Sequence, residues 1–371
     1  MPGTESDRVH MLRAIRLAES GRGYVEPNPT VGCVIVRDGE LLGEGFHRRF
    51  GGPHAEVEAL RSLTDPAAAR GATAYVTLEP CCHVGKTPPC SAALIAAGVA
   101  RVVVAIRDPF PRVDGGGLRQ LREAGIRTDV GVCAAEATKL CAAYLKRVGT
   151  GRPWVIAKWA MTLDGRIATV AGDSQWISGE LSRGEVHRLR GQVDAIVVGG
   201  GTAAADDPTL TARPPGPRVA TRIVVAGQRL PRRDSRLIAT LDQAPLVVVV
   251  PADTDPGVVE PLAAAGAEVF RCRSADRVAM VAELLDDLGR RQFTHLLVEG
   301  GGELLGSFLA AGEIDEVHTY VAAKLVGGRT APGPVSGAGI AKLVDSPEFE
   351  IDSVMRFDDD IRIIARRRQS P

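Results

Sequence analysis

Hydrophobic and polar positions follow two different periods along the chain. Continuous apolar runs such as TVGCVIV (30–36), RVVVAI (101–106) and PLVVVV (245–250) predict buried strands. Segments in which apolar residues recur every three or four positions, such as 8–22 and 134–148, predict helices between the strands. Strands and helices follow one another throughout, which is typical of α/β proteins.

The pattern divides at GTGRP (149–153), a short stretch of small and polar residues that ends in proline. Before it, we expect strands at 30–36, 40–47, 72–78, 101–106 and near 127–132, and helices at 8–22, 54–63, 90–98, 116–125 and 134–148. After it, we expect strands at 154–162, 194–199, 221–227, 245–250, 267–270, 294–300 and 316–327, and helices at 179–190, 256–265, 275–289 and 303–311. A chain of 371 residues exceeds one typical core, so we predict two domains, residues 1–149 and 150–371.

Composition narrows the class of protein. Apolar residues make up 45% of the chain, and 45 basic residues balance 45 acidic ones, so the basic excess of a typical nucleic-acid-binding protein is missing. No apolar run approaches the length of a membrane span, and no charged-then-apolar leader opens the chain, so we expect a cytoplasmic protein. In that reducing compartment the seven cysteines favour metal binding or catalysis over disulfides.

The segments HAE (54–56) and EPCCHVGKTPPC (79–90) hold the donor atoms of a catalytic zinc site. Such a site needs three protein ligands, an open position for water and a proton shuttle that is not a ligand. Zinc nucleobase deaminases arrange these groups as H-x-E followed by P-C-x-x-C, with the Glu as acid and base. We therefore predict that His54, Cys81 and Cys90 bind Zn²⁺. Glu56 is predicted to take a proton from the activated water and to pass protons to the ring nitrogen and the leaving amine.

The cysteine spacing departs from that pattern. Val84 stands where C-x-x-C requires a second thiol, and Cys90 follows nine positions after Cys81. The intervening HVGKTPP is rich in turn residues, so it can loop out and return. Cys82 and His83 are weaker candidates, because neighbouring residues rarely aim both side chains at one ion. The alternative is that the cysteines are small buried residues and the histidine is a solvated helix start.

Three segments carry a resemblance to a known family: NPTVGCVIV, GEGFHRRFGGPHAEVEAL and GATAYVTLEPCCHVGKTPPC. They resemble the deaminase half of the bifunctional deaminase/reductase family of riboflavin biosynthesis. The longer gap between the two cysteines, which ends in GKTPPC, separates that family from cytidine and tRNA-adenosine deaminases, which use C-x-x-C. The resemblance implies an N-terminal cytidine-deaminase-like αβα domain and a pyrimidine substrate with a 5-phosphoribosylamino group. It also implies substrate contacts by Asn28, His47 and Lys86; an amide suits ring edges and a lysine suits a phosphate.

Two glycine runs follow predicted strands in the second half, VVGGGTAAADDP (197–208) and VEGGGELLG (298–306). Glycine lets backbone N–H groups approach a phosphate, and the start of a following helix favours its charge. No acidic residue ends the strand after the first run; the basic GQRLPRR follows instead, which favours NADPH over NADH. Tight turns without a ligand are the alternative.

The resemblance continues through KWAMTLDGRIAT, GDSQWISG, GTAAADDPTLTAR, VEGGGELLGSF and AAKLVGG, which are similar to the reductase half of the same family. It implies a C-terminal dihydrofolate-reductase-like α/β domain that uses NADPH to reduce a ribosylamino sugar to a ribitylamino chain. The implied cofactor contacts are Ala160, Trp176, Thr202, Asp206, Gly301, Gly302, Glu303, Leu304, Leu305, Gly306 and Ser307. The implied substrate contacts are Ser174, Arg190, Leu210, Arg213 and Glu299, with the two arginines as phosphate clamps.

Reduction requires the ribose to open to an imine or aldehyde, so protons must move together with the hydride. Lys158, Asp206 and Glu299 are the polar residues at matching motif positions that can steer these protons. Asp206 is the first candidate for this role, because ADDP is expected to lie in a turn beside the nucleotide loop, and Asp207 is the alternative. A structural ion pair or a solvated strand end is the alternative for Lys158 and Glu299.

Together these observations predict a bifunctional enzyme. Zinc-dependent hydrolytic deamination of 2,5-diamino-6-(5-phosphoribosylamino)pyrimidin-4-one comes first, and NADPH reduction of the ribosylamino side chain follows. A nucleic-acid base deaminase would keep the metal site, but the balanced charge and the absent C-x-x-C argue against it. A non-enzymatic scaffold would have lost catalytic positions, which are intact here. The resemblance also implies a homo-oligomer, a dimer or tetramer, and we expect no nucleic-acid or membrane partner.

Overall fold

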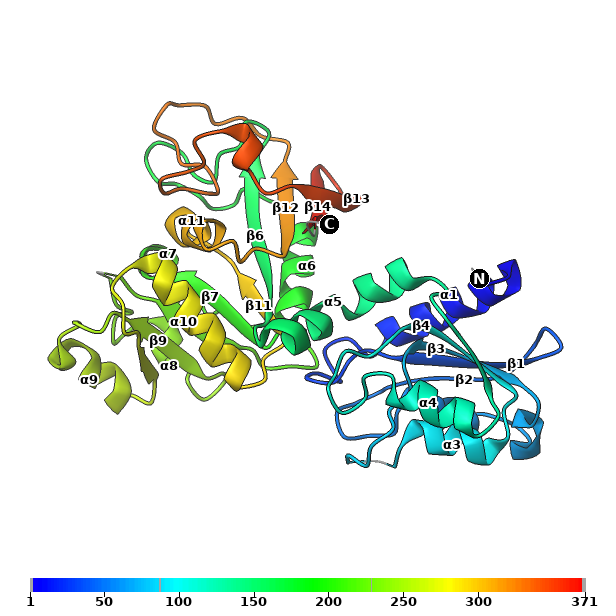
Figure 1. Ribbon diagram of the computed structural model, residues 1–371. Coiled ribbons are helices and arrows are strands. Elements are labelled where there is room, and N and C mark those ends of the chain that lie inside the picture. Colours follow the sequence, from blue (N-terminus) through cyan, green and yellow to red (C-terminus); the bar gives the residue numbers. More distant parts are fainter. Residues whose placement is uncertain (1–2, 87, 228, 369–371) are drawn as a thin grey trace. The chain divides into compact units, whose positions relative to one another are not determined.

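The chain forms two compact units that divide between Gly151 and Arg152 (Figure 1). A computed structural model describes residues 3–86, 88–227 and 229–368. The predicted boundary after residue 149 falls in the last turn of helix α5 (Ala134–Thr150), two residues before the division.

The first unit is built on a five-stranded sheet in the order β2-β1-β3-β4-β5. Its strands are β1 (Gly32–Arg37), β2 (Glu40–Phe46), β3 (Thr73–Leu78), β4 (Arg101–Ile106) and β5 (Arg127–Val130). Its other helices are α1 (Glu5–Glu19), α2 (Ala55–Arg61), α3 (Cys90–Ala97) and α4 (Gly116–Glu123), with a 3₁₀ turn at Pro66–Ala69. β1 is antiparallel to β2 and β3, whereas β3, β4 and β5 run parallel.

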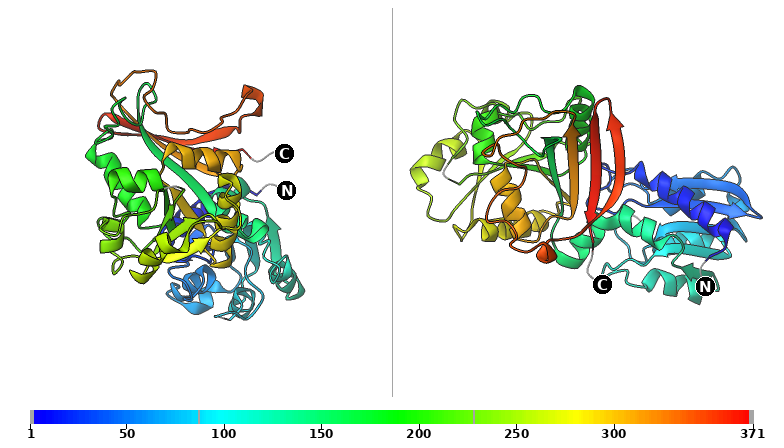
Figure 2. Two further views of the ribbon diagram at one scale, coloured as in Figure 1. Left: turned by 90° about the vertical axis from the view of Figure 1, so that its left-hand side faces the viewer. Right: turned by 90° about the horizontal axis from the view of Figure 1, so that it is seen from above.

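Helices cover both faces of this sheet, with α1 and α5 on one face and α2, α3 and α4 on the other (Figures 1 and 2). In β1, Cys33 and Ile35 pack towards α2, α3 and α4, while Val34 and Val36 pack towards α1 and α5. Successive side chains of a strand point to opposite faces, so a strand covered on both sides is apolar at every position. The prediction of an αβα domain is confirmed.

The second unit contains a nine-stranded sheet in the order β10-β9-β8-β7-β11-β6-β12-β14-β13. Its strands are β6 (Trp154–Thr162), β7 (Ala195–Gly199), β8 (Thr221–Val225), β9 (Leu246–Val250), β10 (Glu268–Arg271), β11 (His295–Val298), β12 (Glu316–Ala322), β13 (Phe349–Phe357) and β14 (Asp360–Arg367). Its helices are α6 (Glu180–Arg190), α7 (Gly200–Asp206), α8 (Arg236–Ala239), α9 (Pro256–Ala264), α10 (Arg277–Arg290) and α11 (Gly302–Ala310), with a 3₁₀ turn at Leu343–Asp345.

The seven strands from β10 to β12 in that order run parallel. α10 and α11 pack on one face of the sheet and bury apolar side chains such as Leu284 and Phe308 against it. Ligands of such sheets bind where parallel strands end at their carboxyl edge. Lys158 lies on β6, Gly199 ends β7 and Glu299 directly follows β11, so three adjacent strands bring these residues to the same region.

The structure adds elements that the sequence pattern does not predict. Helices α7 and α8 and the hairpin of β13 and β14 are new, and the strand predicted at 316–327 ends at Ala322. The hairpin lacks a continuous apolar run, because most side chains of β13 are exposed. Within the described ranges, the helices are all too short or too polar to cross a membrane.

Candidate active sites

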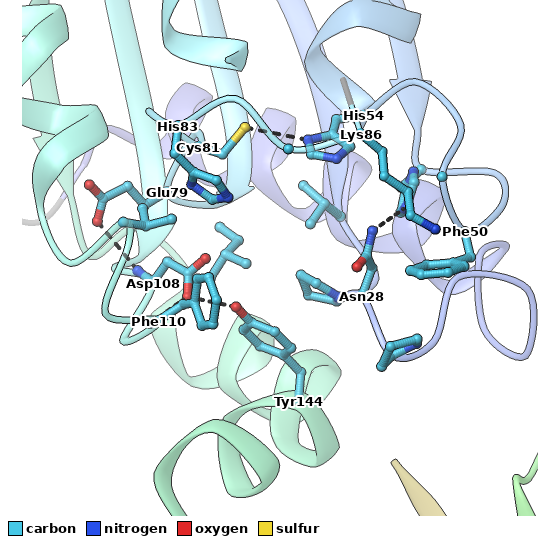
Figure 3. Close-up of a pocket in the computed structure, with 18 of the residues that line it drawn as sticks. Asn28, Phe50, His54, Glu79, Cys81, His83, Lys86, Asp108, Phe110 and Tyr144 are labelled. Atoms are coloured by element: carbon cyan, nitrogen blue, oxygen red, sulfur yellow. Dashed lines mark hydrogen bonds between the residues drawn. The ribbon is translucent and has the colours of Figure 1, made fainter. Parts of the chain in front are cut away.

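The predicted metal ligands of the first unit come together in space. Figure 3 shows His54 and Cys81 facing each other at the edge of the cavity. His54 immediately precedes α2, Cys81 follows β3, and Cys90 begins α3. Their Nδ1 and Sγ atoms all lie within 4.8 Å of one another; His54 Nδ1 is 3.5 Å from Cys81 Sγ and 3.2 Å from Cys90 Sγ. Ligands held at about 2.0–2.3 Å from a tetrahedral zinc ion are spaced in this way.

The chemistry of these donors also fits a cation. The hydrogen bond from the Cys90 thiol is the main reason why the pKa of Cys81 is lowered to about 4, against the opposing effect of burial. Sharing that proton raises the pKa of Cys90. Two adjacent thiolates, one buried and one half-buried, are unfavourable unless a positive ion lies between them. The residues therefore fit Zn²⁺, with two thiolates and one neutral imidazole as ligands.

Glu56 lies beside this cluster without belonging to it. It occupies the first turn of α2, two residues after His54, is buried, and hydrogen-bonds Cys90. Burial is the main reason why the pKa of Glu56 is raised to about 7, and the negative charge of Cys81 adds to it. A carboxyl group with a pKa near neutrality can both accept and donate a proton. By contrast, Glu58 pairs with Arg48 and Arg61 on the surface.

Asn28 and His47 form a fixed pair on the cavity wall. His47 Nδ1 lies 2.9 Å from the Pro53 carbonyl oxygen, which can only accept, so Nδ1 carries the proton. Burial lowers the pKa of His47 and keeps the ring neutral. Its Nε2, 3.2 Å from Asn28 Nδ2, therefore accepts from the amide. This leaves Asn28 Oδ1 as a hydrogen-bond acceptor for a ligand.

These groups line a cavity of about 270 Å³ together with residues that the sequence analysis did not single out. Lys86 lies at its exposed rim, with Nζ 3.8 Å from the centre of the Phe50 ring. On the other wall, the Tyr144 hydroxyl donates to Asp108 Oδ1 at 2.9 Å, and burial raises the pKa of Asp108 (Figure 3). Asp108 and Tyr144 come from separate elements and share no motif, so only the fold reveals them.

Neither of the weaker ligand candidates joins the metal cluster. The Cys82 thiol donates to the Arg112 carbonyl at 3.4 Å, away from the other donors. His83 lines the cavity, and its ring packs 6.0 Å from that of Phe110.

The second unit has a larger cavity of about 620 Å³. Ten of the predicted cofactor, substrate and proton-transfer residues line it: Lys158, Ala160, Ser174, Trp176, Arg190, Thr202, Asp206, Leu210, Arg213 and Glu299. These residues are spread over 142 positions of sequence, from Lys158 to Glu299. The fold therefore gathers them into one site.

Arg190 and Glu299 form a bidentate ion pair within this cavity. Arg190 Nε lies 2.6 Å from Glu299 Oε1, and one terminal nitrogen lies 2.7 Å from Oε2. Although burial favours the neutral acid, Arg190 and Lys158 hold the pKa of Glu299 below its ordinary value. Burial lowers the pKa of Lys158, and Arg190 adds to this effect. The charge of Arg190 is thus already balanced, whereas Arg213 is exposed at the cavity and carries the better charge for a phosphate.

The two aspartates of ADDP have different surroundings. Asp206 ends α7 rather than lying in a turn, and the cavity walls partly desolvate its carboxyl group, which raises its pKa. Asp207 has a positive φ of 39° and accepts a hydrogen bond from the backbone of Arg236 at 2.8 Å. Asp207 therefore holds the start of α8 in place, which is a structural role.

The second glycine run begins helix α11. Gly301 is its N-cap residue, and a Cβ there would lie 2.9 Å from the Thr202 hydroxyl, so the bare backbone lets α7 and α11 approach closely. The side chains of Leu304 and Leu305 are buried in the core. Gly306 packs on Ser336, where a Cβ would lie 1.9 Å from a carbonyl oxygen. A nucleotide would consequently meet the backbone at the start of this helix rather than its leucine side chains.

Comparisons with known proteins agree with this division. Residues 4–106 match the model of the cytidine and deoxycytidylate deaminase zinc-binding region, and residues 153–363 match that of the RibD C-terminal domain. The first match ends with strand β4 and includes His54, Cys81 and Cys90 of the metal cluster. The second match includes all ten of the predicted residues that line the larger cavity.

Full-length relatives extend the similarity over the whole chain. The riboflavin biosynthesis protein RibD of Actinobacillus pleuropneumoniae is 41% identical over 96% of this chain and 94% of its own length. The RibD protein of Escherichia coli is 40% identical over 96% of this chain and 98% of its own length. A solved structure of Acinetobacter baumannii RibD has a TM-score of 0.85 at 36% identity and covers 98% of this chain and 99% of its own.

A Thermotoga maritima structure described as a diaminohydroxyphosphoribosylaminopyrimidine deaminase/5-amino-6-(5-phosphoribosylamino)uracil reductase has a TM-score of 0.81 at 35% identity. It covers 98% of this chain and 99% of its own. In this family a zinc-binding deaminase domain is followed by an NADPH-dependent reductase domain, and both domains are present here. The chain therefore belongs to the RibD family of bifunctional deaminase/reductases of riboflavin biosynthesis.

Proposed function

We propose that the first unit deaminates 2,5-diamino-6-(5-phosphoribosylamino)pyrimidin-4-one and that the second reduces the ribosylamino chain of the product to ribitylamino. The observation that carries this proposal is the cluster of His54, Cys81 and Cys90 beside the buried Glu56 at a small cavity. The substrate named in the Thermotoga protein's description fits the polar groups around both cavities.

In the deaminase site, zinc bound by the three ligands supplies the Lewis acid that activates the attacking water. Glu56 accepts one proton from that water and delivers it to the ring nitrogen. It then takes the second proton from the hydroxyl group now bound to the attacked carbon and passes it to the amine, which leaves as ammonia while the carbonyl forms. Asn28 presents Oδ1, since its Nδ2 is committed to His47, so it accepts a hydrogen bond from an amino or N–H group of the pyrimidine. Lys86 at the rim binds the 5′-phosphate.

In the reductase site, NADPH supplies the hydride that reduces C1′ of the ring-opened imine, while the imine nitrogen gains a proton. Asp206 is our first choice as the proton donor, because partial desolvation raises its pKa and favours the protonated form. Lys158 and Glu299 orient the reacting end of the substrate, and Arg213 binds its phosphate. Ala160, Trp176, Thr202 and the backbone from Gly301 to Glu303 are proposed to hold the cofactor.

Separate assays of the two half-reactions test this assignment. Glu56→Gln should abolish deamination while the variant still reduces supplied deaminated intermediate with NADPH. Asp206→Asn should do the reverse. Glu58→Gln, on the exposed side of the same helix, is the matched control for Glu56 and should leave both activities intact. Loss of both activities in either folded active-site variant would contradict the division of labour.

Three further expectations stay predictions: the cytoplasmic location, the absence of a nucleic-acid partner and the homo-oligomer. The edge strand β13 exposes Ile351, Val354 and Met355, which supports association through the reductase half. Light scattering of the purified protein measures the oligomer directly. Deaminase assays on single-stranded DNA and RNA test the alternative substrate class, and robust turnover there would overturn the proposed one.

A further inference from the structure

His187 lines the reductase cavity but belongs to none of the motifs that identify it. It lies on α6, three residues before Arg190, so the two side chains share one face of the helix. The residue is partly buried, and the same cavity is lined by Arg213 and Glu299. The side chain therefore faces the substrate end of the pocket rather than bulk solvent.

The hydrogen bond that His187 makes fixes the roles of its two nitrogens. Nδ1 lies 3.2 Å from the Thr211 carbonyl oxygen, which can only accept, so Nδ1 carries a proton. A neutral imidazole has one proton, and Nε2 is then left with a lone pair. Burial and the positive charges of Arg190 and Arg213 lower the pKa of His187, which favours this neutral form.

The neighbours of His187 decide which ligand group its Nε2 can take. The guanidinium groups of Arg190 and Arg213 have donors only. The carboxylate of Glu299 is an acceptor, but both of its oxygens already bind Arg190. A phosphate dianion has no proton to offer a lone pair, so it pairs with the exposed Arg213 instead. A sugar hydroxyl, by contrast, can donate to Nε2 and accept from a guanidinium at the same time.

We propose that His187 is a substrate-binding residue of the reductase, whose Nε2 accepts a hydrogen bond from a hydroxyl group of the ribose-derived chain. This inference rests on the proposed reductase function and deepens it. The contact holds the polyhydroxylated chain against α6, beside the Arg190–Glu299 pair, and so orients the carbon that receives the hydride. It also selects a sugar that has the hydroxyl over one that lacks it, because Nε2 would otherwise lose its partner.

Two substitutions separate the roles of the two nitrogens. Asn places its amide near the Nδ1 position and keeps a donor for the Thr211 carbonyl, but it has nothing at the Nε2 position. Gln reaches the Nε2 position and restores an acceptor there. Binding of the deaminated substrate is measured by calorimetry for the wild type, His187→Asn and His187→Gln, each with the intact substrate and with its 2′-deoxy and 3′-deoxy analogues.

We expect His187→Asn to weaken binding of the intact substrate about tenfold, which corresponds to about 1.4 kcal/mol. One deoxy analogue should bind wild type and His187→Asn equally, because its missing hydroxyl is the partner of Nε2. His187→Gln should recover part of the loss, and the KM for NADPH should not change. An equal loss for all three ligands, or no loss at all, would overturn the inference.

The calorimetry also keeps this inference apart from the proposed function. If the wild type fails to reduce the intermediate with NADPH, the proposed function fails, and the binding data still measure what His187 contributes. If the wild type turns over and His187→Asn binds every ligand as the wild type does, only the role of His187 fails.

Discussion

Arg190 on α6 and Glu299 after β11 hold each other through two parallel hydrogen bonds of 2.6 and 2.7 Å, although 109 positions separate them in sequence. A guanidinium and a carboxylate match in this geometry, which a lysine cannot reproduce. The pair fixes Glu299 beside Lys158 in the reductase cavity. The contribution of this ion pair to the stability of the protein can be measured separately from its contribution to catalysis.

A double-mutant cycle on Arg190→Gln and Glu299→Gln makes that separation. Each single change leaves a buried charge without its partner and should lower the free energy of unfolding by about 3 kcal/mol. The double variant removes both charges, so its stability should recover substantially. Its reductase kcat/KM should stay at least about 100-fold below the wild type, as expected when groups that steer protons are lost. Recovery of activity along with stability would show that the pair is structural only.

Loss of a metal ligand should affect one activity only. Cys90→Ser should release zinc and lower deaminase activity by more than about 100-fold, because changes outside the ligand shell alone cost 10–100-fold. Reduction of supplied intermediate should continue, since the reductase cavity contains none of these ligands. Metal content by mass spectrometry and the two assays check this result. Cys82→Ser is the matched control, because the Cys82 thiol faces the Arg112 carbonyl, and it should keep both zinc and activity.

The contact of Lys86 with Phe50 predicts a graded effect on substrate binding. Lys86→Gln removes the charge proposed for the phosphate and should raise the deaminase KM about 20-fold, which lies within the roughly 1.5–3 kcal/mol of a charged hydrogen bond. Phe50→Leu removes the ring beneath Nζ and should raise it about threefold, since exposed cation–π contacts contribute about 0.5–1 kcal/mol. The dephosphorylated substrate is the control: its KM should not respond to Lys86→Gln, and a response would place Lys86 elsewhere.

Local sequence signals predict the strands and the metal site well. A strand such as β1 is buried on both faces, so its sequence is apolar throughout and stands out. His54, Cys81 and Cys90 could be found because deaminase chemistry demands those residue types in that order. The β13–β14 hairpin could not, because its residues are stabilised by pairing along β12 and not by burial of an apolar face. Helix α7 begins with Gly200 and Gly201, which have low helix propensity, so tertiary context decides its conformation.

The cavity walls were predictable only in part. Asp108 and Tyr144 meet across separate elements, and His187 is a single residue on a helix without a motif. Their functional relevance depends on which neighbours they meet, and a single sequence does not encode that directly. Gly306 is a residue whose sequence motif suggests a function that its surroundings do not require. It belongs to a glycine run typical of a phosphate loop, but the position needs glycine because the Ser336 backbone packs against it.

Asp7 links three elements of the deaminase unit and makes its stability depend on pH. Its carboxylate accepts from Arg101 at 2.7 Å, from the Tyr75 hydroxyl at 2.9 Å and from the Thr4 backbone at 2.9 Å, so it joins α1 to β3 and β4. The hydrogen bond from Arg101 is the main reason why the pKa of Asp7 lies well below its ordinary value, while burial opposes the shift. A group whose pKa is depressed by folding stabilises the folded state above its unfolded pKa.

Asp7→Asn should therefore lower the local free energy of unfolding by about 2 kcal/mol at pH 7. The difference from the wild type should shrink as the pH falls below about 4, the pKa in the unfolded chain, towards the lower folded value, because Asp7 is then protonated as well. All three tryptophans lie in the other unit, so their fluorescence does not report on the deaminase unit. Hydrogen exchange of the β3 and β4 amides therefore measures this difference in the deaminase unit alone. Glu136→Gln, which removes the exposed ion pair with Arg8, should change the free energy of unfolding derived from these exchange rates by less than about 0.5 kcal/mol. A difference for Asp7→Asn that stays constant down to pH 2 would show that its carboxylate charge is not what stabilises the unit.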